Sequence, residues 1–164
     1  MPAVWGEDIL LTLPLGTSGQ TVIFTDRILD YFSLHRQINT VQPEAGGQLF
    51  AVISGSEIHI TDITGSRNTD TRHRFQYVPD RKLEQVEINS RFGSGLHYVG
   101  DWHTHPESTG TPSSRDLQSM RECVRKSSHQ LNGFLLVIVG NATVPVGLHV
   151  SLHSGFEVAV LLGG

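Results

Sequence analysis

The sequence has little of what several classes of protein require. Cys123 is the single cysteine among 164 residues, so an internal disulfide cannot form and a reducing compartment is expected. No uninterrupted apolar run approaches the roughly 18 residues of a membrane-spanning helix. Residues 1–11 lack the basic start and long apolar stretch of a secretory signal. We therefore expect a cytoplasmic protein without a membrane partner.

A basic surface is also missing. Lysine and arginine together number 12, against 16 aspartates and glutamates, and the formal net charge is −4. Because proteins that bind nucleic acids usually carry a basic stripe, we expect no nucleic-acid partner.

What is present has the size and composition of one globular domain. Hydrophobic residues make up 38% of the chain and charged residues 17%, without a repeat or a low-complexity segment. We expect a single domain over residues 1–164 with its own core. Nine histidines are many for this length and give the first indication of metal chemistry.

Apolar periodicity, turn signals and helix caps predict strands and helices in mixed order. Helices are expected at 25–37, 79–92 and 113–128. Strands are expected within 8–24 (two, around a Gly-Thr-Ser-Gly turn) and at 47–54, 57–64, 74–79, 96–105, 134–140, 144–153 and 156–162. Hairpins at both ends favour an α/β sandwich, with a mixed and mostly antiparallel sheet flanked by helices, over a doubly wound parallel sheet.

Particular residues are expected to orient these elements. Thr25 is expected to cap the first helix. In the second helix, the side chains of Leu83 and Val86 are expected to face the core. The third helix has an apolar stripe that includes Met120. The segment 134–140 is apolar throughout, as a strand buried on both faces would be.

Two histidines separated by one residue occur in the predicted strand 96–105. Because side chains alternate along a strand, His103 and His105 share one face, about 6.6 Å apart. Two imidazoles at this spacing can converge on one metal ion with bonds of about 2.0–2.1 Å. Pro106 cannot continue a central strand, so the pair is expected at a strand end that opens into a loop.

Asp116 adds a carboxylate to this pair. It lies in the first turn of the predicted helix 113–128, which fixes its direction. Two histidines and one carboxylate with an open fourth position form a catalytic zinc pattern. Water in that position has its pKa lowered to about 7 and becomes a nucleophile at neutral pH.

Each half of this pattern also has a purely structural interpretation. Ser113 and Asp116 have the spacing of a capping box, and His-x-His occurs on exposed strand faces. The combination of six positions at this spacing favours a metal site over either interpretation alone. The six are His103, His105, Pro106, Pro112, Ser113 and Asp116.

The spacing His-Thr-His, seven residues, Ser-x-x-Asp resembles the JAMM motif of the MPN+ or JAB-domain metalloproteases. That family also has a glutamate far upstream. Here the segment Pro-Glu-Ala-Gly-Gly-Gln-Leu-Phe-Ala-Val supplies Glu44, before a glycine pair and an apolar strand. No motif position departs from the family's pattern, and the resemblance covers nearly the whole chain.

The resemblance implies a JAB/MPN-like fold, similar to that of cytidine deaminases, and one Zn²⁺ per chain. It implies that His103, His105 and Asp116 hold the zinc, with Glu44 as general base and Ser113 as oxyanion donor. The implied activity is that of an isopeptidase or peptidase that cleaves after the C-terminal residue of a ubiquitin-like or ubiquitin-like-conjugated protein.

Among members of the family, the chain looks like bacterial JAB peptidases encoded beside E1-like and E2-like conjugation enzymes. Some of these belong to anti-phage signalling operons, where they release a nucleotidyltransferase from its conjugates. Two alternatives stay open. One is a peptidase that processes ubiquitin-like sulfur-carrier precursors, and the other is a non-catalytic, RadC-like partner-binding module.

Several other residues have competing interpretations. Asp101 is interpreted either as a group that orients a metal ligand or as a surface acid, and Trp102 as core. Cys123 is interpreted as a small buried hydrophobe, because it has no partner cysteine. The pair His149 and His153 is assigned to the surface or to packing. The terminal Gly163-Gly164 resembles the end of a ubiquitin-like protein, but a strand ending in a flexible tail is favoured.

Overall fold

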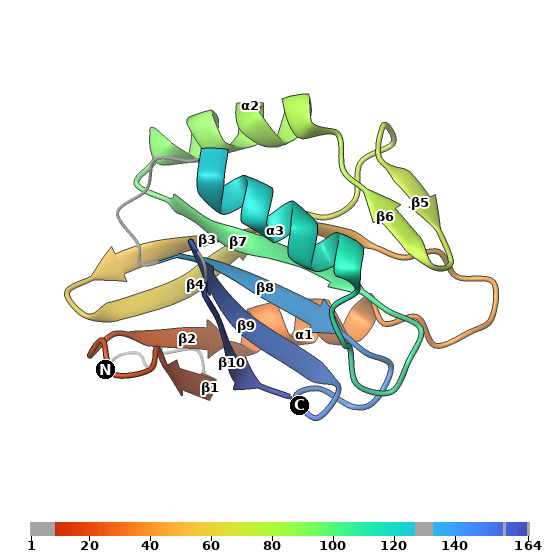
Figure 1. Ribbon diagram of the computed structural model, residues 1–164, viewed down its shortest axis with the longest axis horizontal. Helices are drawn as coiled ribbons and strands as arrows, with labels where there is room; N and C mark the ends of the chain where they lie inside the picture. Colours follow the sequence, from red (N-terminus) through yellow and green to blue (C-terminus); the bar gives the residue numbers. More distant parts are fainter. Residues whose placement is uncertain (1–8, 127–132, 156, 164) are drawn as a thin grey trace, which may run out of the picture.

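The computed structural model describes residues 9–126, 133–155 and 157–163, and its main element is an eight-stranded sheet (Figure 1). The strand order is β1-β2-β4-β3-β7-β8-β9-β10. The strands of this sheet are β1 (Ile9–Pro14), β2 (Thr21–Thr25), β3 (Gly46–Ser54), β4 (Glu57–Ile63), β7 (His97–Thr104), β8 (Phe134–Val139), β9 (Leu148–Ser154) and β10 (Glu157–Leu162). A separate hairpin consists of β5 (Thr71–His73) and β6 (Gln76–Val78), and the helices are α1 (Asp26–Leu34), α2 (Arg81–Phe92) and α3 (Ser114–Lys126).

The sheet is mixed and mostly antiparallel, as predicted. Parallel pairing occurs between β2 and β4 and between β7 and β8, whereas the other pairs in the sheet are antiparallel. Helix α1 lies on one side of the sheet, and α2 and α3 lie on the other (Figure 1). This arrangement confirms the predicted α/β sandwich.

Strand β8 divides the core into two parts. Leu135, Val137 and Val139 pack into the larger cluster, which also contains Trp102 and the buried apolar side chains of α1. Their neighbours along the strand pack with Met120 of α3. Every residue of β8 is buried, so the prediction of a strand covered on both faces is confirmed.

Helix α2 forms where it was predicted, but the prediction of its inward face was wrong. Leu83 is 39% exposed and Val86 60% exposed, whereas the buried residue of this helix is Glu84, at 4%. Helix α2 covers polar groups, because the Gln48 side chain donates to the Glu84 carbonyl and Arg81 pairs with the Glu84 carboxylate. The prediction assumed that the apolar residues of a helix face the core, so it could not identify a polar inward face.

Several boundaries also differ from the prediction. Thr25 lies at the N-cap of α1, but its hydroxyl makes no capping bond. Strand β9 begins at Leu148 rather than at residue 144, because residues 144–147 form a turn. The expected end of the third helix at 127–128, the start of the last strand at 156 and Gly164 lie outside the described residues.

Both histidines of β9 belong to the interior. His149 and His153 are each 3% exposed, which agrees with the packing alternative and not with a surface position. The Ser151 hydroxyl lies 2.8 Å from Nε2 of His153. Burial lowers the pKa of His153 to about 4, which keeps its ring neutral.

Among the described residues, no helix is long and apolar enough to cross a membrane.

Candidate metal centre

The site lies where β7 ends and α3 begins. His103 is part of β7, and the backbone N–H of His105 donates to Val139 of β8 at 3.0 Å, which continues the parallel pairing past the strand end. The two Nε2 atoms are 3.2 Å apart. The two imidazoles therefore converge from one strand, as the alternation of side chains predicts.

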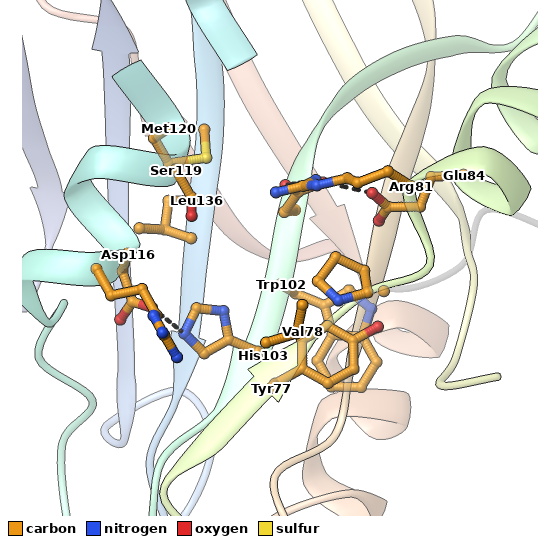
Figure 2. A pocket seen from close by; sticks show the side chains of 14 residues that line it. Tyr77, Val78, Arg81, Glu84, Trp102, His103, Asp116, Ser119, Met120 and Leu136 are labelled. Atoms are coloured by element: carbon orange, nitrogen blue, oxygen red, sulfur yellow. Dashed lines mark hydrogen bonds and ion pairs between the residues drawn. The ribbon is translucent and has the colours of Figure 1, made fainter. Parts of the chain in front are cut away.

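Asp116 faces both imidazoles from the first turn of α3. Its Oδ1 lies 3.1 Å from Nε2 of His103, and its Oδ2 lies 3.3 Å from Nε2 of His105. Figure 2 shows the first of these contacts as a dashed line. Zinc–ligand bonds of about 2.0–2.1 Å in a tetrahedron separate neighbouring ligand atoms by about 3.3 Å. The donor set and its spacing therefore fit a zinc ion.

Ser113 and Asp116 also form the capping box. The backbone N–H of Ser113 donates to Oδ2 of Asp116 at 2.8 Å, and the N–H of Asp116 donates to the Ser113 hydroxyl oxygen at 3.1 Å. Burial alone would raise the pKa of Asp116, but hydrogen bonds from His103 and His105 outweigh it and hold the pKa well below its usual value. The structural and the functional interpretation of this motif therefore apply to the same atoms.

Glu44 also lies close to the imidazole pair. Three atoms that can bind a metal, one each from Glu44, His103 and His105, all lie within 4.8 Å of one another. The Glu44 side chain is buried, at 4% exposure, and burial raises its pKa to about 7 against the opposing charges of the two histidines. A carboxyl of this kind can take up and release a proton near neutral pH.

Two carboxylates thus compete for the role of third metal ligand. A ligand atom of Glu44 lies within 4.8 Å of one from each histidine, and the Asp116 oxygens lie 3.1 and 3.3 Å from the Nε2 atoms of His103 and His105. The Asp116 distances match those between two ligands of one zinc ion.

Glu107 is a functional candidate that the sequence reasoning missed. Its Oε1 lies 3.2 Å from Nδ1 of His105 and also accepts the backbone N–H of Thr111. An imidazole that offers Nε2 to a metal carries its proton on Nδ1, and a carboxylate partner fixes that tautomer. An acid two residues after a ligand histidine was the available signal.

Two cavities lie next to the imidazole pair and Asp116, and Tyr77 of β6 lines both. The first has a volume of about 210 Å³ and extends from His103 towards α2 (Figure 2). The second has a volume of about 290 Å³ and contains Glu44, His105 and Ser113.

Tyr77, which lines both cavities, packs against the site. Its ring is nearly parallel to that of His103, with 6.5 Å between centroids and 23° between planes. A Cβ atom on Gly46 would lie 2.5 Å from the Tyr77 ring, so the close approach of this ring to β3 requires glycine.

The other residues that were singled out lie nearby without joining the ligands. Asp101 accepts a hydrogen bond from the Tyr98 hydroxyl at 2.6 Å and lies 4.0 Å from Arg81. Cys123 is partly buried, packs against the Met120 cluster and lies 3.6 Å from the Tyr98 hydroxyl. Trp102 is buried at 1% exposure, which confirms it as core.

Comparison with known proteins places this fold and site in a family. The family model described as "Prokaryotic homologs of the JAB domain" matches residues 32–151. The chain therefore belongs to the prokaryotic JAB family, and the resemblance drawn from its motif is confirmed. A solution structure from Desulfitobacterium hafniense shares the fold, with a TM-score of 0.59 at 17% identity over 84% of this chain and 87% of that one.

Curated relatives indicate the class of activity. A Vibrio cholerae protein named "CD-NTase/cGAS isopeptidase" is 30% identical over 122 residues, which are 73% of this chain and 76% of the relative. A probable metalloprotease of Sinorhizobium fredii is 34% identical over 87 residues, which are 50% of this chain and 53% of the relative. Together with the family, these names indicate a metalloprotease or isopeptidase.

Proposed function

We propose that this protein is a zinc-dependent, JAMM-type isopeptidase whose single domain spans residues 1–164. We propose that it cleaves the amide bond after the C-terminal residue of a ubiquitin-like or ubiquitin-like-conjugated protein. The observation that carries this proposal is the convergence of His103, His105 and Asp116, with 3.1–3.3 Å between the facing atoms and Glu44 beside them.

We assign one Zn²⁺ per chain to His103, His105 and Asp116. The two imidazoles and the carboxylate are the ligand types of catalytic zinc, and their separations suit it. When bound, zinc supplies a Lewis acid that activates a water molecule and polarises the scissile carbonyl.

Glu44 is proposed to move the proton. Its carboxylate accepts a proton from the attacking water as the new carbon–oxygen bond forms. The same proton then goes to the nitrogen of the leaving amine as the carbon–nitrogen bond breaks. A pKa raised by burial to about 7 suits both steps, because the group is then a base and an acid near neutral pH.

Ser113 is proposed to stabilise the oxyanion. Its hydroxyl oxygen accepts the N–H of Asp116 at 3.1 Å, and that bond does not use the hydroxyl proton. The side chain is exposed and lines the same cavity as Glu44 and His105. The hydroxyl proton can therefore be donated to negative charge that develops on the carbonyl oxygen.

For the substrate, we propose a CD-NTase nucleotidyltransferase joined through its C-terminus to another protein in a bacterial cytoplasm. The support is the name of the Vibrio cholerae relative, which is 30% identical over 73% of this chain. Such a conjugate would be made by E1-like and E2-like enzymes and would place protein on both sides of the cleaved bond. The two cavities, one lined by His103 and the other by His105, are compatible with such a substrate.

The proposal is tested with two probes and three variants. The first probe is a CD-NTase from the source genome with a fluorescent protein attached to its C-terminal residue, and the second is a sulfur-carrier protein extended in the same way. We expect about one zinc per wild-type chain and cleavage of the first probe. Glu44→Gln should retain zinc and lose cleavage, and His103→Ala should lose both.

Glu57→Gln is the matched control, because Glu57 has the same side chain, 54% exposed, away from the site. This variant should cleave at the wild-type rate. Cleavage of the second probe alone would favour sulfur-carrier processing. A wild-type rate in Glu44→Gln, or a wild-type chain without zinc, would refute the proposed mechanism.

A further inference from the structure

We propose that Arg72 of β5 is a positioning residue for Glu44, so that the β5–β6 hairpin sets the place of this carboxylate relative to the metal ligands. The inference rests on the proposed function, because it concerns the residue assigned there as the proton carrier. The inference is argued from the hydrogen bonds that the backbone makes at Glu44 and at the residue after it.

Both backbone polar groups of Glu44 are bonded to β5. The Glu44 N–H donates to the carbonyl of His73 at 2.7 Å, and Nε of Arg72 donates to the Glu44 carbonyl at 2.7 Å. Buried backbone groups require such partners, and Glu44 finds them in the hairpin rather than in the eight-stranded sheet. The Arg72 bond is the one that a side-chain substitution can remove.

The next residue is bonded to the strand that carries the metal ligands. The N–H of Ala45 donates to the Thr104 hydroxyl at 3.0 Å, and the N–H of Thr104 donates to the Ala45 carbonyl at 2.9 Å. Thr104 is the residue between His103 and His105. Glu44 and Ala45 therefore bridge the hairpin on one side and the metal-ligand strand on the other.

A buried amide connects these parts a second time. Gln37, 2% exposed, accepts the Thr104 hydroxyl at 2.8 Å through Oε1. Its Nε2 donates to the carbonyls of Arg74 at 2.9 Å and of Gln42 at 3.0 Å. The carboxylate of Glu44 is thus placed by a frame of hydrogen bonds, of which Arg72 supplies the side-chain donor on the hairpin side.

The hairpin needs such attachments. It has only three residue pairs, and all three residues of β5 are exposed. Two-stranded hairpins are marginally stable alone. At its other end, the Tyr77 hydroxyl donates to Asp70 at 2.8 Å, and Asp70 also accepts the N–H of Asp80. Removing the Arg72 bond should therefore loosen the hairpin at Glu44 while the Asp70 end stays in place.

The consequence for catalysis is selective. His103, His105 and Asp116 are held by β7, β8 and α3, so zinc binding should not depend on Arg72. Glu44 should lose its fixed position, and a misplacement of about 1 Å in a catalytic group can lower a rate by about 100-fold. The loss should therefore appear in kcat rather than in KM or zinc content.

The experiment compares Arg72→Ala and Arg72→Lys with Arg74→Ala in the zinc-loaded protein. Arg74 is a matched control, because it belongs to the same hairpin and also donates to a backbone carbonyl, that of Asn39, at 3.0 Å. With the CD-NTase fusion as probe, we expect Arg72→Ala to lower kcat by about 10- to 100-fold with KM within about twofold. Arg72→Lys should recover part of the loss, and Arg74→Ala should match the wild type.

Amide hydrogen exchange of the segment 43–46 gives a readout that does not depend on activity. We expect faster exchange in Arg72→Ala than in the wild type and no change in Arg74→Ala. If both variants had the same kcat and the same exchange, or if exchange rose while kcat stayed at the wild-type value, the inference would be overturned. Failure of the wild type to cleave would refute the proposed function instead, and the exchange comparison would still decide whether Arg72 places Glu44.

Discussion

Replacing Thr104 with valine tests the hydrogen-bonded frame around the site by its effect on stability. Valine has nearly the same shape as threonine but has no hydroxyl group. Thr104 is fully buried, and its hydroxyl both accepts from the Ala45 N–H at 3.0 Å and donates to Oε1 of Gln37 at 2.8 Å. The substitution therefore leaves one donor and one acceptor without partners in the interior.

The expected cost follows from those two groups. Ala45 is 4% and Gln37 2% exposed, so water cannot replace the lost partner. An unsatisfied buried polar group costs about 1–3 kcal/mol, so Thr104→Val should lower the free energy of unfolding by about 2–6 kcal/mol. Thr104→Ser keeps the hydroxyl and loses one methyl group, which costs about 1 kcal/mol.

Urea unfolding followed by tryptophan fluorescence measures this difference, because Trp102 is buried beside the site. Free zinc is kept at one concentration for all variants, since a bound ligand adds to the measured stability. With a slope of about 2 kcal/mol per molar urea, the midpoint should fall by about 1–3 M in Thr104→Val and by about 0.5 M in Thr104→Ser. Equal midpoints for the two variants would show that the hydroxyl does not carry the two bonds.

Three further predictions concern stability. Gly47→Ala places a Cβ 1.9 Å from the Thr64 carbonyl oxygen, so the free energy of unfolding should fall by about 3 kcal/mol or more in thermal unfolding. An unchanged midpoint would contradict this close approach of β3 to Thr64. Burial raises the pKa of Glu84 from 4.5 to about 7, so its stabilising contribution is present below pH 4.5 and is lost as the pH rises towards 7. The free energy of unfolding should therefore fall less across this range in Glu84→Gln than in the wild type. Parallel pH profiles of the two proteins would refute the raised pKa of Glu84. Val86→Gln should change the free energy of unfolding by less than about 0.5 kcal/mol, because the side chain is 60% exposed, and a larger loss in urea unfolding would indicate an inward face.

The convergence of the proposed metal ligands could be anticipated because it depends on local geometry. His103 and His105 share a strand face whatever the rest of the fold does, and Asp116 has a fixed position in the first turn of α3. The family pattern then pointed to Glu44, which lies 59 residues before His103 in the chain. Their roles as ligands and base remain predictions for the zinc and cleavage measurements.

The inward face of α2 could not be anticipated in the same way. A helical period identifies residues that share a face, but it does not say which face meets the protein. Here Gln48 and Arg81 surround Glu84, and that polar environment exists only after β3 and α2 have come together. The burial of His149 and His153 has the same origin, because it depends on what covers β9.

The sequence by itself determined the α/β class, the two-sided burial of β8 and the motif that assigns the chain to the JAB family, because each depends on residues close together in the chain or on their spacing. Only the tertiary structure decided the polar inward face of α2 and the bonds from Arg72 and His73 that hold Glu44. These contacts join elements that are far apart in the chain and are brought together by packing and by hydrogen bonds between strands. The local spacing of residues in the sequence does not determine such contacts.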